Sequence, residues 1–133
     1  MEPALDLPWF APGVVRHRLP LYLLGPRDLA LSFAHRWWQW ARHGPALPPR
    51  AALDTETFRL LVANARWLGA AGPSEPAWLT LARATAAPVL HELRLTAGNE
   101  AAVWHELLLP TAEDGRHVGA ILQVVQHRGC RGA

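Results

Sequence analysis

The sequence predicts an α+β fold in which N-terminal helices pack on a C-terminal antiparallel meander. Between residues 28 and 86, apolar side chains recur every three or four positions, which is typical of amphipathic helices. Between residues 89 and 127, apolar and polar residues alternate in short stretches, and the gaps carry Gly with Asn or Asp, as hairpin turns require. A length of 133 residues suits a single domain, which we place at residues 28–127.

Residues 1–27 are predicted to form an arm followed by an edge strand. The start of the chain is rich in Pro and Leu and includes Trp9 and Phe10, so we expect an irregular arm that docks through these aromatic rings. The stretch Val14–Leu24 then brings β-branched and aromatic residues around Pro20. Because proline cannot donate to a sheet ladder, a strand here should be short or lie at an edge.

Two helices are predicted next, joined by a proline-rich connector. Asp28 is the expected N-cap of the first helix, which runs from Leu29 to Arg42. The connector that follows contains three prolines, which keep it extended. Asp54 is the expected cap of the second helix, which continues to about Leu68 with apolar residues on one face.

A third, shorter helix and three strands complete the predicted domain. The helix begins with Ser74 as its cap and ends before Pro88, which cannot continue it. The predicted strands are Val89–Thr96, Ala102–Leu109 and Val118–His127. Alternation along the strands places Leu107, Leu109 and the Val118–Val124 face among the most buried positions.

Composition argues against several classes of protein. The thirteen basic residues are all Arg, they are scattered, and the net charge is only +2, which argues against nucleic-acid binding. No apolar stretch approaches the roughly 20 residues of a membrane helix, and the N-terminus lacks the layout of a secretory signal. We therefore expect no membrane span and a cytoplasmic location. The single cysteine, Cys130, lies in residues 128–133, which are predicted to be a flexible tail.

The chain contains seven tryptophans, and three of them lie within four residues of one predicted helix. At 100° per residue, no helix can bury Trp37, Trp38 and Trp40 on one narrow stripe. At least one should then face a ligand, a partner or another subunit, unless the helix is wedged between two layers of its own fold. We assign ligand or partner binding to Trp37, Trp38, Trp40 and Trp104, together with Trp9 and Phe10 of the arm.

Two histidine–glutamate dipeptides lie on neighbouring predicted strands, at His91-Glu92 and His105-Glu106. Depending on register, the two imidazoles would be cross-strand neighbours that could bind a metal or titrate together. The simpler interpretation is two half-exposed polar residues on the outer face of the sheet. No motif ties either histidine to a nucleophile or to an orienting carboxylate, so we assign no catalytic residue and no metal ligand.

The order of several short motifs resembles a known family. Along the chain they are the Trp37-Trp38 pair before Arg42-His-Gly-Pro-Ala-Leu-Pro-Pro-Arg50, then Leu53-Asp54, Pro88-Val89, Glu106-Leu-Leu-Leu-Pro110 and Asp114-Gly115. In this order they resemble short, single-domain bacterial PAS-like proteins, over residues 36–68 and 86–126. The resemblance implies a sensor or signalling module. Some PAS-type sensors hold heme through a helical histidine, for which His35 and His43 are the candidates, but the identity of any cofactor stays unknown.

The chain departs from the family pattern after the second predicted helix. Family members usually place a strand with Tyr-Arg and a Gly-rich turn directly after that helix. Here Leu68 runs into Gly69-Ala-Ala-Gly-Pro73 and a third helix. We therefore expect a truncated or rearranged PAS-like sheet, in which Val14–Leu24 replaces the front half.

Three functional hypotheses remain open. The first is a non-enzymatic, PAS-like regulatory module that binds a partner protein or a small apolar ligand through its aromatic surface, as a homodimer or in a hetero-complex. The second is a small α+β pocket enzyme that uses a histidine or carboxylate as acid and base. The third is a structural subunit whose aromatic face docks into a larger assembly.

Overall fold

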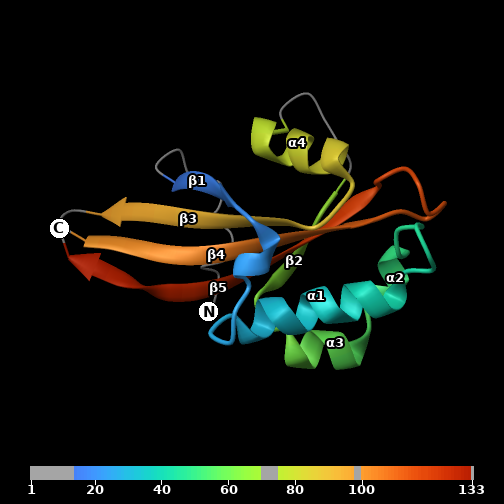
Figure 1. Ribbon diagram of the computed structural model, residues 1–133, viewed down its shortest axis with the longest axis horizontal. Coiled ribbons are helices and arrows are strands. Elements are labelled where there is room, and N and C mark those ends of the chain that lie inside the picture. The colour runs from blue at the N-terminus through green and yellow to red at the C-terminus, as the bar shows by residue number, and fades with distance from the viewer. Residues whose placement is uncertain (1–13, 70–74, 98–99, 133) are drawn as a thin grey trace.

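The computed structural model describes residues 14–69, 75–97 and 100–132, and these form an α+β fold around a five-stranded antiparallel sheet (Figure 1). The strands are β1 (Val14–Leu19), β2 (Ala65–Leu68), β3 (Val89–Ala97), β4 (Glu100–Thr111) and β5 (Ala120–Gly132), in the spatial order β1-β3-β4-β5-β2. The helices are α1 (Leu29–Ala41), α2 (Arg50–Leu53), α3 (Glu56–Leu61) and α4 (Ala77–Thr85). Trp9, Phe10 and Ser74 lie outside the described residues. None of the helices described is long and apolar enough to cross a membrane.

The predicted meander of the last three strands is confirmed. β3 pairs with β4, and β4 pairs with β5, both antiparallel and in the order of the chain. Leu107 and Leu109 are fully buried, and Leu122 and Val124 of the expected face of β5 are buried as well. Val118 and Ala120 of that face are only partly buried, because β5 begins at Ala120, later than the alternation suggested.

The two edges of the sheet are formed by short strands from earlier in the chain. β1 pairs with β3, so the prediction of a short edge strand before Pro20 is confirmed. The prediction of one helix up to Leu68 is wrong: α3 ends at Leu61, and β2 pairs antiparallel with β5 from Ala65. Strands therefore come before and between the helices, in contrast to the expected order of helices first and sheet last.

Strand β5 is longer than the sequence suggested. It continues through 128–132, residues that composition assigned to a flexible tail. In the structure these residues pair with the start of β4, where Val103 lies opposite Gly129 and Glu100 lies opposite Gly132. A β-bulge between Val103 and Trp104 shifts the register between the two halves of this long hairpin.

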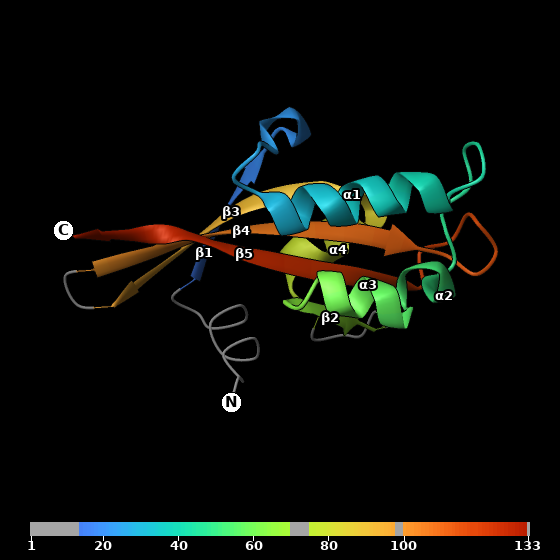
Figure 2. The same cartoon turned by 90° about the horizontal axis from the view of Figure 1, so that it is seen from below.

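The sheet carries helices on both faces (Figures 1 and 2). α1, α2 and α3 cover one face, where Trp38, Leu53 and Phe58 pack against Leu107 and Leu109. α4 covers part of the other face, where its buried residues Leu79 and Ala82 pack against Val89, Leu108 and Ile121. Since successive residues of a strand point to opposite faces, β4 contributes alternately to the two cores.

The helix caps differ from the prediction at two positions. Thr55, one residue after the expected Asp54, caps α3 by accepting a hydrogen bond from the backbone N–H of Phe58 at 3.1 Å. The carboxylate of Asp54 instead pairs with Arg59 at 2.6 Å. Asp28 precedes α1 as expected, but its side chain makes no capping hydrogen bond to the helix. The carboxylate of Asp28 instead accepts a hydrogen bond from the backbone N–H of Gly25 and contacts His105 and Arg128 on the sheet.

The C-cap of α4 is the non-glycine residue with a positive φ in the described chain. Ala86 has φ 53° and ψ 37°, the left-handed conformation that commonly ends helices but is usually occupied by glycine. For an alanine this conformation carries a steric cost, because its Cβ lies close to the following carbonyl. The helix ends here, and Ala87 and Pro88 lead into β3, which begins at Val89.

Replacing Ala86 with glycine should therefore raise stability. Glycine adopts the left-handed conformation without the steric cost, and the gain is partly offset by its greater freedom in the unfolded chain. We expect Ala86→Gly to stabilise the protein by about 0.5–1 kcal/mol. Chemical denaturation of Ala86→Gly beside Ala84→Gly, an exposed position inside α4, checks this. Ala84→Gly should lower stability by about 1 kcal/mol, and loss of stability in both variants would contradict the argument.

Candidate functional site

The three clustered tryptophans of α1 lie in three different environments. Trp38 is buried, with 3% of its surface exposed, and its Nε1 donates to the carbonyl of Pro110 at 2.8 Å. Trp37 is half-buried against the ring of Phe58, at 5.4 Å between centroids. Trp40 is 76% exposed. The expectation that one helix cannot bury all three is confirmed, and Trp40 is the one that faces outward.

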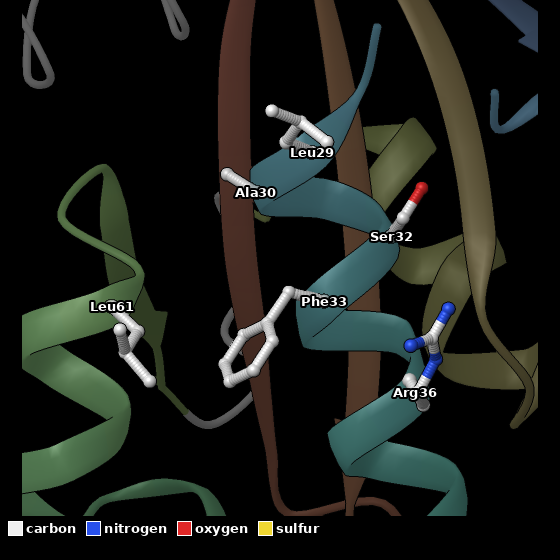
Figure 3. A pocket seen from close by; sticks show the side chains of 6 residues that line it. All are labelled: Leu29, Ala30, Ser32, Phe33, Arg36 and Leu61. Carbon is white, nitrogen blue, oxygen red and sulfur yellow. The ribbon is translucent and has the colours of Figure 1, made fainter. Parts of the chain in front are cut away.

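A groove of about 520 Å³ lies between α1 and α3 (Figure 3). It is lined by Leu29, Ala30, Ser32, Phe33, Arg36 and Leu61, and we call it the α1–α3 groove. In Figure 3 the ring of Phe33 extends from α1 toward α3, and Leu61 projects from α3 on the facing side. The walls are therefore largely apolar, with a single charged side chain, Arg36.

The α1–α3 groove is continuous with an exposed stripe along α1. Leu29, Phe33, Arg36 and Trp40 follow the spacing i, i+4, i+7 and i+11, which places them on one side of a helix. Leu29 is 72% exposed at one end of this stripe and Trp40 is 76% exposed at the other. Trp40, which the sequence analysis assigned to binding, thus lies on the same side of α1 as the groove residues Leu29, Phe33 and Arg36. The sequence analysis did not select those three residues.

Trp104 does not belong to this surface. It is half-buried on the opposite face of the sheet, in a small cluster with Leu93 and Val125. Its ring meets the imidazole of His127 edge-on at 4.7 Å. The alternation of β4 explains this, because Trp104 shares a face with Leu108, which packs under α4. The structure therefore separates Trp104 from the tryptophans of α1.

A second candidate site is a cluster of buried polar side chains from four strands, Arg16, His91, Glu106 and Gln123, which we call the Glu106 cluster. Glu106 on β4 is fully buried. Arg16 from β1 binds both of its carboxylate oxygens, each at 3.1 Å. His91 Nδ1 lies 2.8 Å from Oε1, and Gln123 Nε2 donates to Oε2 at 2.6 Å. Every strand of the sheet except β2 contributes one member.

The electrostatics of this cluster keep Glu106 ionised. Burial raises the pKa of its carboxyl, but the hydrogen bonds from His91 and Arg16 and their charges outweigh burial and lower that pKa below its ordinary value. An ionised carboxylate can only accept hydrogen bonds. His91 must therefore carry its proton on Nδ1, and Gln123 must present its amide nitrogen. The Oε1 atom of Gln123 is buried without a partner in the described part of the chain.

The Glu106 cluster borders a pocket of about 210 Å³ beneath α4, which we call the α4 pocket. Its lining residues are Arg16, Arg18, Trp78, Leu81, Ala82, Val89 and His91. The guanidinium of Arg16 lies 3.6 Å from the centre of the Trp78 ring, a cation–π contact. The Trp78 ring stands perpendicular to the imidazole of His91 at 6.4 Å. His91 thus links the buried carboxylate to the pocket.

The other predicted histidine, His105, belongs to a separate cluster on the α1 face. Its Nδ1 lies 3.1 Å from the carboxylate of Asp28, which is only 2% exposed and also accepts a hydrogen bond from Arg128 at 3.2 Å. Gln126 accepts a hydrogen bond from the N–H of Ala30 at 3.2 Å. These contacts attach the N-terminus of α1 to β4 and β5.

The sequence allowed the two imidazoles to be cross-strand neighbours and favoured two half-exposed residues on the outer face of the sheet. Neither holds, because both histidines are buried and the register separates them. His91 lies opposite Glu106, and Glu92 lies opposite His105, so the two histidines are on opposite faces of the sheet. Each histidine instead has a carboxylate partner that sequence analysis missed. The register of the hairpin would have been enough to predict the His91–Glu106 pair. It places His91 opposite Glu106 and Glu92 opposite His105, so each histidine faces a glutamate across the hairpin.

The two histidines considered for heme lie at different places, on α1 and after it. His35 is half-buried on α1, where burial and then the charge of Arg42 lower its pKa, and His43 is exposed in the connector after α1. In the part of the chain that the structure describes, no three His, Cys, Asp or Glu side chains gather to hold a metal ion. No family model, curated protein or solved structure matches the chain.

The Glu106 cluster predicts a specific acid sensitivity. Glu106→Gln should lower the free energy of unfolding at neutral pH by about 3–5 kcal/mol, because it leaves Arg16 buried without its counter-charge. The folded-state pKa of Glu106 lies below the unfolded value of about 4.3, so ionised Glu106 stabilises the fold above that pH. This stability is lost as the pH falls through the folded-state pKa. The difference between wild type and Glu106→Gln should therefore shrink in acid.

Denaturant unfolding between neutral and acidic pH measures this difference. Glu92→Gln is the matched control, because Glu92 lies one residue from His91 but pairs only with Arg94, whose side chain is 47% exposed. This control should change stability by less than about 1 kcal/mol. A Glu106→Gln variant as stable as Glu92→Gln at neutral pH would show that the Glu106 cluster does not hold the sheet together.

Proposed function

We propose that this protein is a non-enzymatic, PAS-like interaction module that binds a partner protein through the α1–α3 groove and Trp40. The observation that carries the proposal is that Leu29, Phe33 and Trp40 lie on one side of α1 beside the groove, with Arg36 among them. Leu29 and Trp40 are each more than 70% exposed on this side of α1, and an exposed apolar surface bordered by polar residues is typical of an interaction site. Trp40 is suited to this role because tryptophan is enriched among residues that dominate interface energies.

The chemistry of the groove favours the apolar face of a helix as the bound element. Leu29, Phe33 and Leu61 supply apolar contacts between two helices, the geometry in which an amphipathic helix docks by residues spaced three and four apart. Arg36 is the charged residue of the lining and favours an acidic residue beside that face. The helix belongs to a second protein, or to a second copy of this chain.

Two features support the PAS-like part of the proposal. The α+β fold with a central antiparallel sheet is compatible with it. In addition, β2 brings Arg66 and Trp67 into a strand directly after α3, followed by Gly69. The family pattern has a strand with Tyr-Arg at this position, and here the strand carries Arg66-Trp67 without a tyrosine.

A pocket enzyme is the second candidate, favoured by one observation. The contact of His91 with buried Glu106 is the arrangement that holds an imidazole in one tautomer for acid–base chemistry. However, the described lining of the α4 pocket contains no Ser, Cys, Thr or Lys that could act as a nucleophile. We therefore favour the interaction module.

Trp40→Ala should remove partner binding and leave the fold intact, since the side chain is 76% exposed. Trp38→Ala should lower the free energy of unfolding by about 3–5 kcal/mol, because it empties a buried site and removes the hydrogen bond to Pro110. Tyr22→Ala is the matched control, an 83% exposed aromatic residue outside the groove lining. Thermal unfolding should be unchanged for Trp40→Ala and Tyr22→Ala.

Binding is measured in two ways. Sedimentation of the purified chain tests self-association. Quantitative affinity purification from cells identifies proteins retained by wild type and Tyr22→Ala but lost with Trp40→Ala, and the purified pair is then titrated by calorimetry. We expect at least a tenfold weaker affinity for Trp40→Ala. Equal retention of every self or foreign partner by Trp40→Ala and wild type would overturn the proposal.

A further inference from the structure

The α4 pocket lies on the face of the sheet opposite the α1–α3 groove, so a role for this pocket is independent of the proposed function. Its floor is the edge formed by β1 and β3, and its roof is α4. The α4 segment is fixed to the sheet side by Arg83, which donates to the carbonyls of Gly119 at 3.0 Å and Gly69 at 2.7 Å and pairs with Glu75 at 2.9 Å. The helix that forms the roof of the pocket is therefore held in place by the hydrogen bonds of Arg83.

His91 lines this pocket and has one ring nitrogen that no described residue binds. Its side chain is only 9% exposed, and its Nδ1 proton is committed to the carboxylate of Glu106. The remaining nitrogen, Nε2, has no hydrogen-bond partner among the described residues, and the ring lines the pocket. When the ring is neutral and its proton is on Nδ1, the Nε2 atom carries a lone pair. This atom is an acceptor suited to a hydroxyl group of a ligand.

Arg18 supplies the second polar group. It lies directly opposite His91 in the β1–β3 register, so the two side chains project from neighbouring points of the same face. The charges of Arg16 and Glu106 compensate one another within the cluster, whereas Arg18 makes no ion pair with any described residue. The pocket thus carries a surplus positive charge beside the imidazole. An arginine in this position suits a carboxylate, which it can bind with two parallel hydrogen bonds.

The rest of the lining is apolar. Trp78, Leu81, Ala82 and Val89 surround the two polar groups, and the ring of Trp78 is held in place by the guanidinium of Arg16. Pockets for drug-sized ligands measure about 300–1,000 Å³. The α4 pocket, at about 210 Å³, is smaller and suits a molecule with one ring.

We propose that the α4 pocket binds a small aromatic hydroxy acid, with its carboxylate on Arg18, its hydroxyl donating to His91 Nε2, and its ring against Trp78. Each part of the ligand corresponds to one part of the lining. A neutral aromatic alcohol would leave Arg18 without an anion, and an aromatic acid without a hydroxyl would leave the His91 acceptor unused. A protein site that hydrogen-bonds a ligand group discriminates against analogues that lack it.

The experiment titrates the full chain with the three isomers of hydroxybenzoate, with benzoate and with phenol, using calorimetry at neutral pH. The tightest hydroxybenzoate isomer should bind at least tenfold more tightly than benzoate or phenol. In NMR spectra, the indole N–H signal of Trp78 should shift on binding, whereas that of Trp40 should not. No saturable binding of any isomer at millimolar concentration, or benzoate binding as tightly as the best isomer, would overturn the proposal.

Two variants separate the roles of the polar groups. Arg18→Gln removes the charge from an exposed side chain and should reduce the advantage of hydroxybenzoate over phenol to less than threefold. His91→Asn keeps an N–H donor near the Nδ1 position for Glu106 but removes Nε2, and should abolish the advantage of hydroxybenzoate over benzoate. Arg116→Gln, at an exposed turn position distant in sequence, is the control and should bind as wild type does.

Thermal unfolding establishes whether His91→Asn is folded. If it is not, the ligand ranking on wild type and the Arg18→Gln variant still decide the proposal, because neither depends on His91→Asn. Hydroxybenzoate binding that is equal in wild type and Arg18→Gln would place the ligand elsewhere and overturn the assignment.

Discussion

The buried carboxylate of Glu106 is the constraint on which the sheet depends. It lies on the central strand with no exposed surface, and a buried charge is tolerated only when it is paired and hydrogen-bonded. Its three partners come from β1, β3 and β5, so satisfying one carboxylate joins four strands side by side. A one-residue slip of β4 would turn Glu106 toward the α1 face and break all of these contacts. The cluster therefore specifies register as well as contributing to stability.

The alternation of β4 divides the molecule into two faces with different chemistry. Leu107 and Leu109 face an apolar core in which Trp38 anchors α1. This face of the sheet therefore stabilises the fold mainly by burying apolar surface. The opposite side combines the Glu106 cluster with a smaller apolar core under α4. On the α1 face, Asp28 is the buried carboxylate. It contacts His105 and Arg128 and so holds the start of α1 against the sheet, which keeps the exposed stripe of α1 on the outside.

Much of the fold could be predicted from local patterns, and the remainder depends on long-range pairing. The meander follows from alternation and from short turns, and α1 follows from helical spacing and its proline-rich end. β2 could not be predicted, since a helical pattern continues through Leu68 and only the unpaired edge of β5 selects a strand there. The three environments of Trp37, Trp38 and Trp40 follow from helix geometry, but which of them is exposed depends on where the sheet lies. The partners of His91 and His105 required the hairpin register.

The two candidate sites differ in how the fold supports them. Trp40 and Leu29 keep their exposure because α1 is fixed at its N-terminus by Asp28 and at its C-terminal half by Trp38, so the stripe cannot turn inward to cover itself. His91 is held from the inside of the fold: Glu106 binds the Nδ1 atom of its ring, and the ring lines the α4 pocket. In both cases a buried hydrogen bond fixes the orientation of the element: that of Trp38 fixes α1 and its exposed stripe, and that of His91 fixes the imidazole in the lining of the α4 pocket. The strand alternation that separates Glu106 from Leu107 also places the two sites on opposite faces of the sheet, and the effects of substitutions at sites that share no partners usually add.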